Sequence, residues 1–161
     1  MRILVLSDTH IPRTSNDLPK KIYDEIRGAD MIFHAGDFVE KGLYEKLSAL
    51  KTIVAVHGNM DSSALQQQLK AKEVIAVEGV KIGLIHGFGP ARDLIDTVRK
   101  EFKDVDAIVF GHSHSATNTV KDGVLFFNPG TATDRVFATT NTYGILEVDG
   151  KNIKGSIIQL E

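Results

Sequence analysis

Residues 107–114 read AIVFGHSH, an apolar run followed by a glycine and by two histidines that one serine separates. A short apolar run with β-branched residues predicts a buried strand. In extended chain the side chains at positions i and i+2 point to the same side, so His112 and His114 can converge. Such a pair is typical of a metal site, of a catalytic pair or of an ordinary surface loop, and the rest of the sequence has to distinguish them.

Four earlier apolar runs of similar length also predict buried strands. The five predicted strands cover residues 3–6, 30–35, 52–56, 81–86 and 107–110. Between them, apolar residues recur at helical spacing, as Ile22, Tyr23 and Ile26 do in a predicted helix over 19–27. Further helices are predicted around 43–50 and, after Pro90, around 94–102. This alternation predicts an α/β fold with a largely parallel central sheet and right-handed crossovers.

The last third of the chain and one earlier segment carry hairpin signals. Asp-Gly pairs stand at 122–123 and 149–150 between apolar runs, and Glu78-Gly79 separates the runs at 74–77 and 81–85. We therefore expect β-rich meanders added to the α/β core, with two mixed sheets packed face to face and helices outside. No linker, repeat or low-complexity segment interrupts the sequence, so residues 1–161 are expected to form a single domain.

The composition limits the chemistry. The chain has 161 residues, of which 42% are hydrophobic and none is cysteine, so disulfides, thiolate nucleophiles and thiolate metal ligands are excluded. A formal net charge of −2 gives no reason to expect nucleic acid or a membrane surface as a partner. The apolar stretch near the N-terminus is too short for a signal peptide. We expect a soluble, cytoplasmic protein whose metal ligands are nitrogen and oxygen atoms.

Polar side chains follow each of the five predicted strands. They are Asp8 and His10, then Asp37, Asn59 and His86, and finally His112 and His114. Each has an ordinary structural explanation when taken alone, either as a turn residue or as a hydrogen-bonded core histidine. Ligands, however, collect outside the carboxyl ends of strands in α/β sheets, and separate coincidences would have to recur at five successive strand ends. The pattern therefore predicts a joint metal site.

The number and type of these side chains indicate two metal ions. Seven side chains exceed what one cation with an open coordination position uses, so we expect two cations that share a bridging carboxylate. Carboxylate and imidazole ligands without sulfur suit transition metals, with manganese expected first and nickel, iron or zinc as alternatives. Two divalent cations, two aspartates and a bridging hydroxide leave a residual charge of about +1. Such a site attracts phosphate esters, which are the expected substrates.

The same residues, in this order, resemble the motifs of the calcineurin-like metallophosphoesterases. The motifs are SDTH at 7–10, GD at 36–37, GNMD at 58–61, HG at 86–87 and GHSH at 111–114. The likeness is to the short prokaryotic phosphodiesterase branch, which includes relatives of the retromer scaffold subunit. The resemblance implies a four-layer α/β/β/α sandwich and a divalent-metal-dependent phosphodiesterase with a dinuclear site.

The resemblance also implies a role for each residue. One cation would be held by Asp8, His10, Asp37 and His114, and the other by Asp37, Asn59, His86 and His112. Asp37 would bridge the two cations. A metal-bridging hydroxide would attack phosphorus while the surroundings of His86 steady the non-bridging oxygens. The catalytic residues implied in this way are Asp37, Asn59 and His86.

Positions next to these motifs carry weaker indications. Many members of the family have a histidine after the GN pair that helps to protonate the leaving group, and this chain has Met60 there. We expect slower turnover and a preference for good leaving groups, with Asp61 left to cap the following helix. His57 is a candidate substrate-binding residue, or else a strand-end histidine satisfied by backbone. Phe38 and Phe88 either line the groove or belong to the core.

Two other functions fit the same residues. A phosphomonoesterase or pyrophosphatase would use the same cations, and the charge of the site does not separate these enzymes from a phosphodiesterase. A weakly active protein-binding scaffold would keep the fold and use its surface instead. The complete set of seven ligand positions favours an enzyme, whereas Met60 argues slightly for the scaffold.

Overall fold

The strands form two five-stranded sheets. The structure is a computed structural model and describes residues 1–161. The first sheet has the order β10-β9-β1-β2-β3, with β1 Arg2–Leu6, β2 Met31–His34, β3 Ile53–Ala55, β9 Thr142–Asp149 and β10 Asn152–Gln159. The second has the order β4-β5-β6-β8-β7, with β4 Lys72–Val77, β5 Val80–Ile85, β6 Ala107–Val109, β7 Thr117–Lys121 and β8 Val124–Asn128. Both sheets are mixed, because parallel neighbours such as β1 and β2 or β5 and β6 lie beside antiparallel ones.

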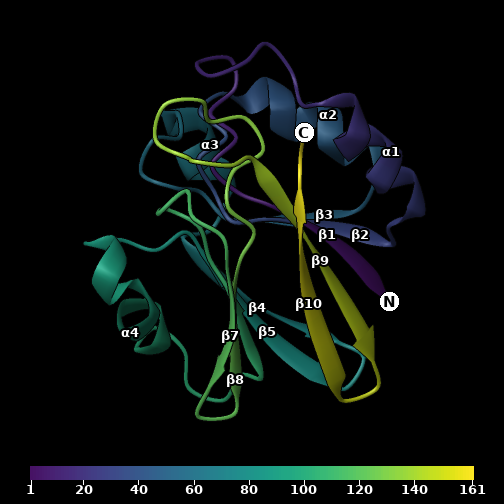
Figure 1. The fold of residues 1–161 in the computed structure, drawn as a ribbon, viewed down its shortest axis with the longest axis vertical. Helices are drawn as coiled ribbons and strands as arrows, with labels where there is room; N and C mark the ends of the chain where they lie inside the picture. The colour runs from purple at the N-terminus through teal and green to yellow at the C-terminus, as the bar shows by residue number, and fades with distance from the viewer.

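Helices cover the outer face of each sheet. They are α1 Lys20–Gly28, α2 Lys41–Leu50, α3 Ser63–Gln68 and α4 Leu94–Arg99, the last preceded by a 3₁₀ turn at Ala91–Asp93. Figure 1 shows α1 and α2 over the first sheet and α4 on the far side of the second. The predicted α/β/β/α sandwich is therefore confirmed. None of these helices reaches the length and hydropathy that a membrane span requires.

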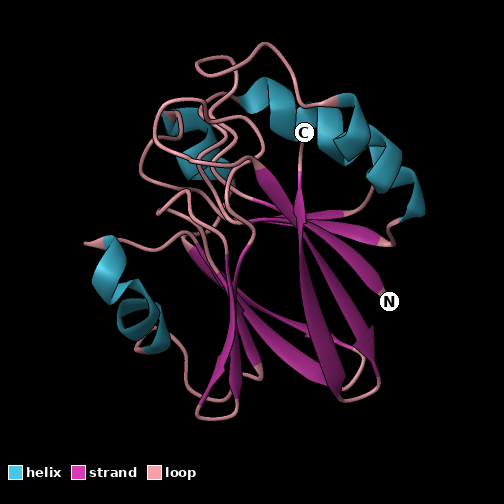
Figure 2. Ribbon diagram, in the orientation of Figure 1, coloured by secondary structure: helices cyan, strands magenta, loops and turns pink.

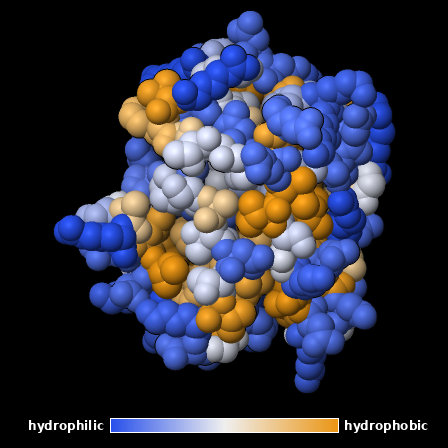
Figure 3. Space-filling model, viewed as in Figure 1, coloured by the Kyte–Doolittle hydropathy of each residue, from blue (hydrophilic) through white to orange (hydrophobic).

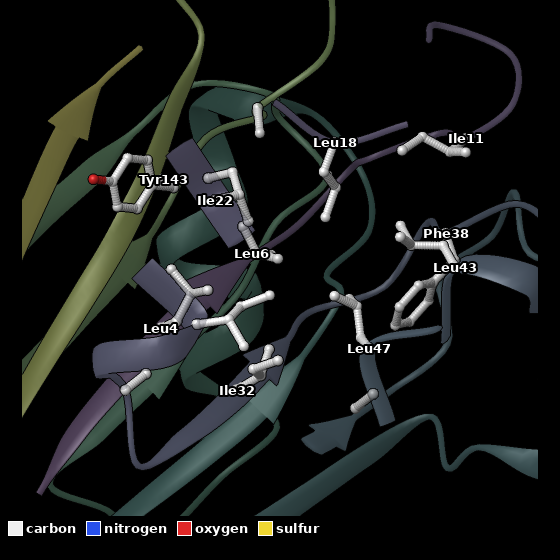
Figure 4. Close-up of a cluster of buried hydrophobic side chains, with 14 of the residues drawn as sticks. Leu4, Leu6, Ile11, Leu18, Ile22, Ile32, Phe38, Leu43, Leu47 and Tyr143 are labelled. Carbon is white, nitrogen blue, oxygen red and sulfur yellow. The ribbon is translucent and has the colours of Figure 1, made fainter. Parts of the chain in front are cut away.

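Three hydrophobic clusters hold the four layers together, and β1 belongs to two of them. Leu4 and Leu6 point into a cluster of 17 residues beneath the helices of the first sheet, which Figure 4 shows in close-up. Ile3 and Val5 point the other way, into a cluster of 15 residues between the sheets. A third cluster, of 8 residues, joins the second sheet to α4. Because alternate residues of a strand face opposite sides, a strand buried on both faces has to be apolar throughout.

Two local predictions need adjustment. The β9–β10 register pairs Asp149 with Asn152, so the tight turn is Gly150-Lys151, one residue later than the Asp-Gly pair suggests. The helix expected to reach residue 102 ends at Arg99, and Phe102 packs into the third cluster from the segment beyond it. The predicted Asp122-Gly123 turn is confirmed, with φ values of 52° and 76° that suit a tight hairpin.

The loops that follow β1, β2, β3, β5 and β6 meet at one end of the molecule. Figure 2 shows this end as a concentration of loops between α3 and α4. Backbone hydrogen bonds connect the loops across the chain, from the Asp8 N–H to the Gly36 carbonyl and from the Gly111 N–H to the His86 carbonyl, each at 3.0 Å. On the face shown in Figure 3, hydrophilic side chains predominate and separate apolar patches lie among them.

Candidate metal centre

Most of the predicted ligands have an unusual backbone conformation. Five of the seven have positive φ values, namely Asp8 at 52°, His10 at 46°, Asp37 at 61°, His112 at 71° and His114 at 58°. Residues other than glycine rarely adopt this left-handed conformation, which costs about 1–3 kcal/mol and concentrates at functional sites. The loops therefore hold these side chains in positions that relaxed turns would not give.

Two motif glycines let the loops approach these side chains closely. A Cβ atom at Gly58 would lie 2.1 Å from Oδ1 of Asp37, and one at Gly111 would lie 1.8 Å from Oγ of Ser7 and 2.6 Å from Oδ2 of Asp8. No side chain fits at either position without moving an aspartate or its support. The GN and GH motifs therefore require glycine at these positions, because there is no room for a side chain.

Oδ1 of Asp8 is the centre of the cluster. It lies 3.4 Å from Nε2 of His114 and 3.8 Å from Nε2 of both His10 and His86. Asp8, His10 and His114 form one group whose ligand atoms all lie within 4.8 Å of one another, and Asp8, Asp37 and His86 form a second. Two atoms bound to one tetrahedral cation at about 2.0–2.2 Å lie about 3.3–3.6 Å apart, so the spacing suits a shared metal ion.

Asp37 lies between the two groups. Its Oδ2 is 3.2 Å from Nε2 of His86 and 3.5 Å from Nε2 of His10. Its Oδ1 accepts a hydrogen bond from the Met60 N–H at 2.8 Å, which fixes the carboxylate beside Asn59. Asp37 thus lies close to one histidine of each group, whereas Asp8 is the residue common to both groups.

The buried atoms of the cluster lack hydrogen-bond partners. Oδ1 of Asp8 and Nε2 of His10 and His86 have none, although the other oxygen of Asp8 accepts hydrogen bonds from the Ser7 hydroxyl and the His112 N–H. A buried polar atom without a partner costs about 1–3 kcal/mol. One carboxylate oxygen and two imidazole nitrogens without partners, distributed over the two groups, are ligand atoms that transition-metal cations accept, so the residues fit the expected metals.

Each of three histidines is oriented through the nitrogen that faces away from the cluster. Nδ1 of His86 lies 2.8 Å from the Ala35 carbonyl oxygen, Nε2 of His112 lies 3.1 Å from the Gly89 carbonyl oxygen, and Nδ1 of His114 contacts the Asp134 carboxylate. Histidines that bind metals usually donate their other N–H to an oxygen in this way. Sequence reasoning missed Asp134, which closes the segment FNPGTATD at 127–134 and bears no local sign of its contact.

The carboxylates and imidazoles of the cluster shift one another's pKa values. Burial alone would raise the pKa of Asp8, but its contacts with His10 and His114 and the charge of His86 lower that pKa far below its ordinary value. Burial lowers the pKa of His86, yet Asp37 and Asp8 outweigh it and raise the pKa to about 9. The Asp8 carboxylate likewise raises the pKa of His114 to about 9, against burial and with help from Asp134. Without a metal ion, both imidazoles are therefore protonated at neutral pH.

His34 lies beneath the site with both of its nitrogens engaged. Nδ1 accepts a hydrogen bond from the Gly36 N–H, so Nε2 carries the proton that it shares with the Thr9 hydroxyl oxygen at 3.1 Å. Burial lowers the pKa of His34 to about 3, which keeps the ring neutral. Its ring stacks on Phe38, with 3.5 Å between centroids. No nitrogen of His34 is free for a cation, and Phe38 is a core residue.

Three of the other predicted residues line a cavity next to the cluster, together with His86. His57, Asn59, His86 and Phe88 all belong to its wall, and its volume is about 360 Å³. His112 stands outside both groups of close ligand atoms, with its ring centroid 5.3 Å from that of His86. His57 and Asn59 therefore face the space into which a molecule bound at the cluster would extend.

The prediction that Asp61 caps the following helix is wrong. Ser62 is the N-cap of α3, because its hydroxyl accepts the Leu65 N–H. The Asp61 carboxylate is buried and instead accepts hydrogen bonds from the N–H groups of Asp37, Val39 and Gly58, at 3.0, 2.7 and 2.7 Å. Burial raises the pKa of Asp61 in spite of these bonds. Asp61 thus ties the loop of Asp37 to the loop of Asn59.

The fold and the cluster together define a class of metal-dependent hydrolases with a four-layer α/β/β/α architecture. Residues 1–151 match the calcineurin-like phosphoesterase superfamily domain, and the chain belongs to that family. It is 36% identical over 137 residues to a probable metallophosphoesterase of Methanocaldococcus jannaschii, covering 83% of this chain and 69% of the relative.

Solved structures share the fold of this chain. Vacuolar protein sorting 29 (Vps29) of Cryptosporidium parvum matches with a TM-score of 0.80 and 21% identity, over 99% of this chain and 97% of that one. Vps29 of Entamoeba histolytica, crystallised with zinc, matches with a TM-score of 0.76 and 27% identity over 99% of both chains. The first similarity concerns the fold alone, and the second is to a protein that binds a metal ion.

Proposed function

We propose that this protein is a divalent-metal-dependent phosphodiesterase with a dinuclear site. The observation that carries the proposal is the set of buried, unpartnered atoms on Asp8, His10 and His86, which face one another at one end of the two sheets. Asp8, His10, Asp37 and His114 would hold one cation, and Asp37, Asn59, His86 and His112 the other. Manganese is the expected metal, with nickel, iron and zinc as alternatives, and the zinc complex of the Entamoeba relative supports a transition metal.

When bound, a pair of such cations generates a nucleophile from water at neutral pH and stabilises the attacking and leaving oxygens. Oδ2 of Asp37 lies near Nε2 of both His10 and His86, which belong to different groups of ligand atoms. Its Oδ1 accepts the hydrogen bond of the Met60 N–H. Asn59 contributes an amide oxygen without adding negative charge, which keeps the site attractive to an anionic diester. His57 lies in the cavity wall, where its ring can contact a phosphoryl oxygen or an ester group.

The reaction would cleave one P–O bond of the diester. Water supplies the oxygen that attacks phosphorus, and the products are a phosphomonoester and an alcohol. No side chain at position 60 can give the departing oxygen a proton, since Met60 is a thioether that is 39% exposed. Position 60 therefore gives the leaving group no general acid, which favours esters whose leaving group departs as a stable anion.

The first test is metal-dependent release of an aryl group by purified protein loaded with Mn²⁺ or Ni²⁺. We expect a bis-aryl phosphodiester to be cleaved faster than the aryl monoester. Asp37→Ala should lower kcat/KM by at least about 10³-fold, because several kcal/mol of transition-state stabilisation are lost with the bridge. Asp104→Ala, which changes an exposed aspartate, should retain full activity.

The other outcomes are equally informative. Faster cleavage of the monoester would identify a phosphomonoesterase, and cleavage of pyrophosphate alone a pyrophosphatase. No metal-dependent release from any ester would contradict the proposal and favour the scaffold function.

Introducing a general acid should extend the range of substrates. Met60→His places an imidazole after the GN pair, next to the Asp37 carboxylate that the Met60 N–H already contacts. General acid catalysis contributes about 10²–10⁴-fold, so we expect kcat for alkyl leaving groups to rise by at least about 10-fold. Aryl leaving groups, which need little protonation, should change far less. Equal kcat values for Met60→His and wild type on an alkyl diester would refute this account of Met60.

A further inference from the structure

Only two of the eight phenylalanines are exposed, and both lie beside the metal centre. Phe88 is 54% exposed and Phe137 is 82% exposed, whereas the other six are buried. A phenylalanine side chain normally contributes to a core because burying it is favourable. Two exposed rings at one site are therefore a feature that the packing of the protein does not explain.

Phe88 stands at the His86–His112 end of the cluster. It is part of the same cavity wall as His86 and Asn59. The next residue, Gly89, accepts the hydrogen bond of His112 through its carbonyl oxygen, at 3.1 Å. The ring of Phe88 is thus attached to the loop that orients a predicted ligand.

Phe137 stands beside His114, which belongs to the other group of close ligand atoms. Its ring centroid is 6.4 Å from that of His114, and the rings of His114 and His10 are 5.1 Å apart. One oxygen of Asp134 contacts Nδ1 of His114, and the other accepts the Phe137 N–H at 3.1 Å. The carboxylate that orients the ligand therefore also fixes the backbone position of Phe137.

We propose that Phe88 and Phe137 determine substrate specificity, each facing one of the two ester groups of a bound phosphodiester. The proposal rests on the proposed function and deepens it. The substrate class is a phosphodiester with a planar aromatic or heteroaromatic group on each side. A monoester has a single ester group and can contact only one of the two rings.

The test compares Phe88→Ala and Phe137→Ala with wild type on a bis-aryl diester and on a methyl aryl diester. A favourable contact between aromatic rings corresponds to about 2- to 12-fold in affinity, so each variant should lose about 3- to 10-fold in kcat/KM on the bis-aryl diester, through KM. On the methyl aryl diester only one of the two variants should lose efficiency. Val120→Ala, at a 68% exposed position on β7, is the matched control and should change neither substrate.

A binding measurement separates this proposal from the proposed function. Calorimetry with Mn²⁺-loaded protein and dibenzylphosphinate, whose P–C bonds cannot be hydrolysed, reports the aromatic contacts even in a protein without turnover. We expect binding about 3- to 10-fold weaker in each phenylalanine variant, with unchanged metal content. Equal binding by both variants and wild type, or wild-type binding of dimethylphosphinate as tight as of dibenzylphosphinate, would overturn the proposal. Absence of turnover alone would refute only the proposed function.

Discussion

Asp8→Asn is expected to weaken the binding of Mn²⁺ by at least about 100-fold, and to remove metal-dependent hydrolysis with it. The substitution is nearly isosteric, but it removes the one negative charge that touches three imidazoles. Oδ1 of Asp8 lies within 3.8 Å of Nε2 of His10, His86 and His114 and has no other partner. An amide at this place offers a neutral, weaker ligand, so most of the electrostatic attraction for a cation is lost.

Titration calorimetry with Mn²⁺ measures the loss directly, and far-UV circular dichroism checks that the variant is folded. Asp104→Asn provides the matched control, since it makes the same chemical change at an exposed aspartate. Asp8→Asn protein that binds Mn²⁺ with wild-type affinity would show that the cluster centred on Asp8 is not the metal site.

The affinity for the metal should also depend steeply on pH. The pKa values of His86 and His114 are raised to about 9 in the metal-free protein, by Asp37 and Asp8 in one case and by Asp8 and Asp134 in the other. A cation needs the neutral imidazole, so each histidine has to release a proton before it can bind. Below pH 9 the apparent affinity for each of the two cations should therefore fall by up to about 10-fold per pH unit, with two protons released per protein when both cations bind.

The stability of the metal-free protein should change with pH in the opposite direction to its affinity for the metal. Because the folded pKa values lie above the ordinary 6.5, protonation of His86 and His114 stabilises the metal-free protein fully below pH 6.5. That stabilisation is lost as the pH rises through 9, where metal binding becomes strongest. Calorimetry between pH 6 and 9 in buffers of different ionisation enthalpy counts the released protons. An affinity for Mn²⁺ that stays constant over this range would contradict the assignment of these two histidines.

The fold and most of the cluster could be predicted from local sequence. Each ligand-bearing segment combines a short apolar run with a polar residue at its end, as AIVFGHSH does at 107–114. Periodicity identifies the strands, and the rule that ligands gather at strand ends brings the loops together. The Asp-Gly pairs likewise predict the turns of two hairpins, and the observed turns lie within one residue of the predicted positions.

The residues that sequence reasoning missed or misjudged act through long-range contacts. Asp134 is 20 positions from His114, and Asp61 accepts hydrogen bonds from N–H groups 22 and 24 positions away. No periodicity or turn chemistry marks the position of Asp134, and helix-cap chemistry gives Asp61 a different partner from the one it has. Phe137 occupies an irregular segment, where no pattern distinguishes an exposed ring from a buried one. Contacts of this kind become visible only when the loops are arranged in space.

The division of the ligands between the two sheets has a consequence for the assembly of the site. Both aspartates, together with His10 and Asn59, follow strands of the first sheet, whereas His86, His112 and His114 follow strands of the second. Neither sheet supplies the whole centre, because the loops of the second provide no carboxylate ligand and those of the first only a single imidazole ligand. The complete set of seven ligands therefore forms only when the two sheets pack together, and a metal ion bound there would link the loops of one sheet to those of the other.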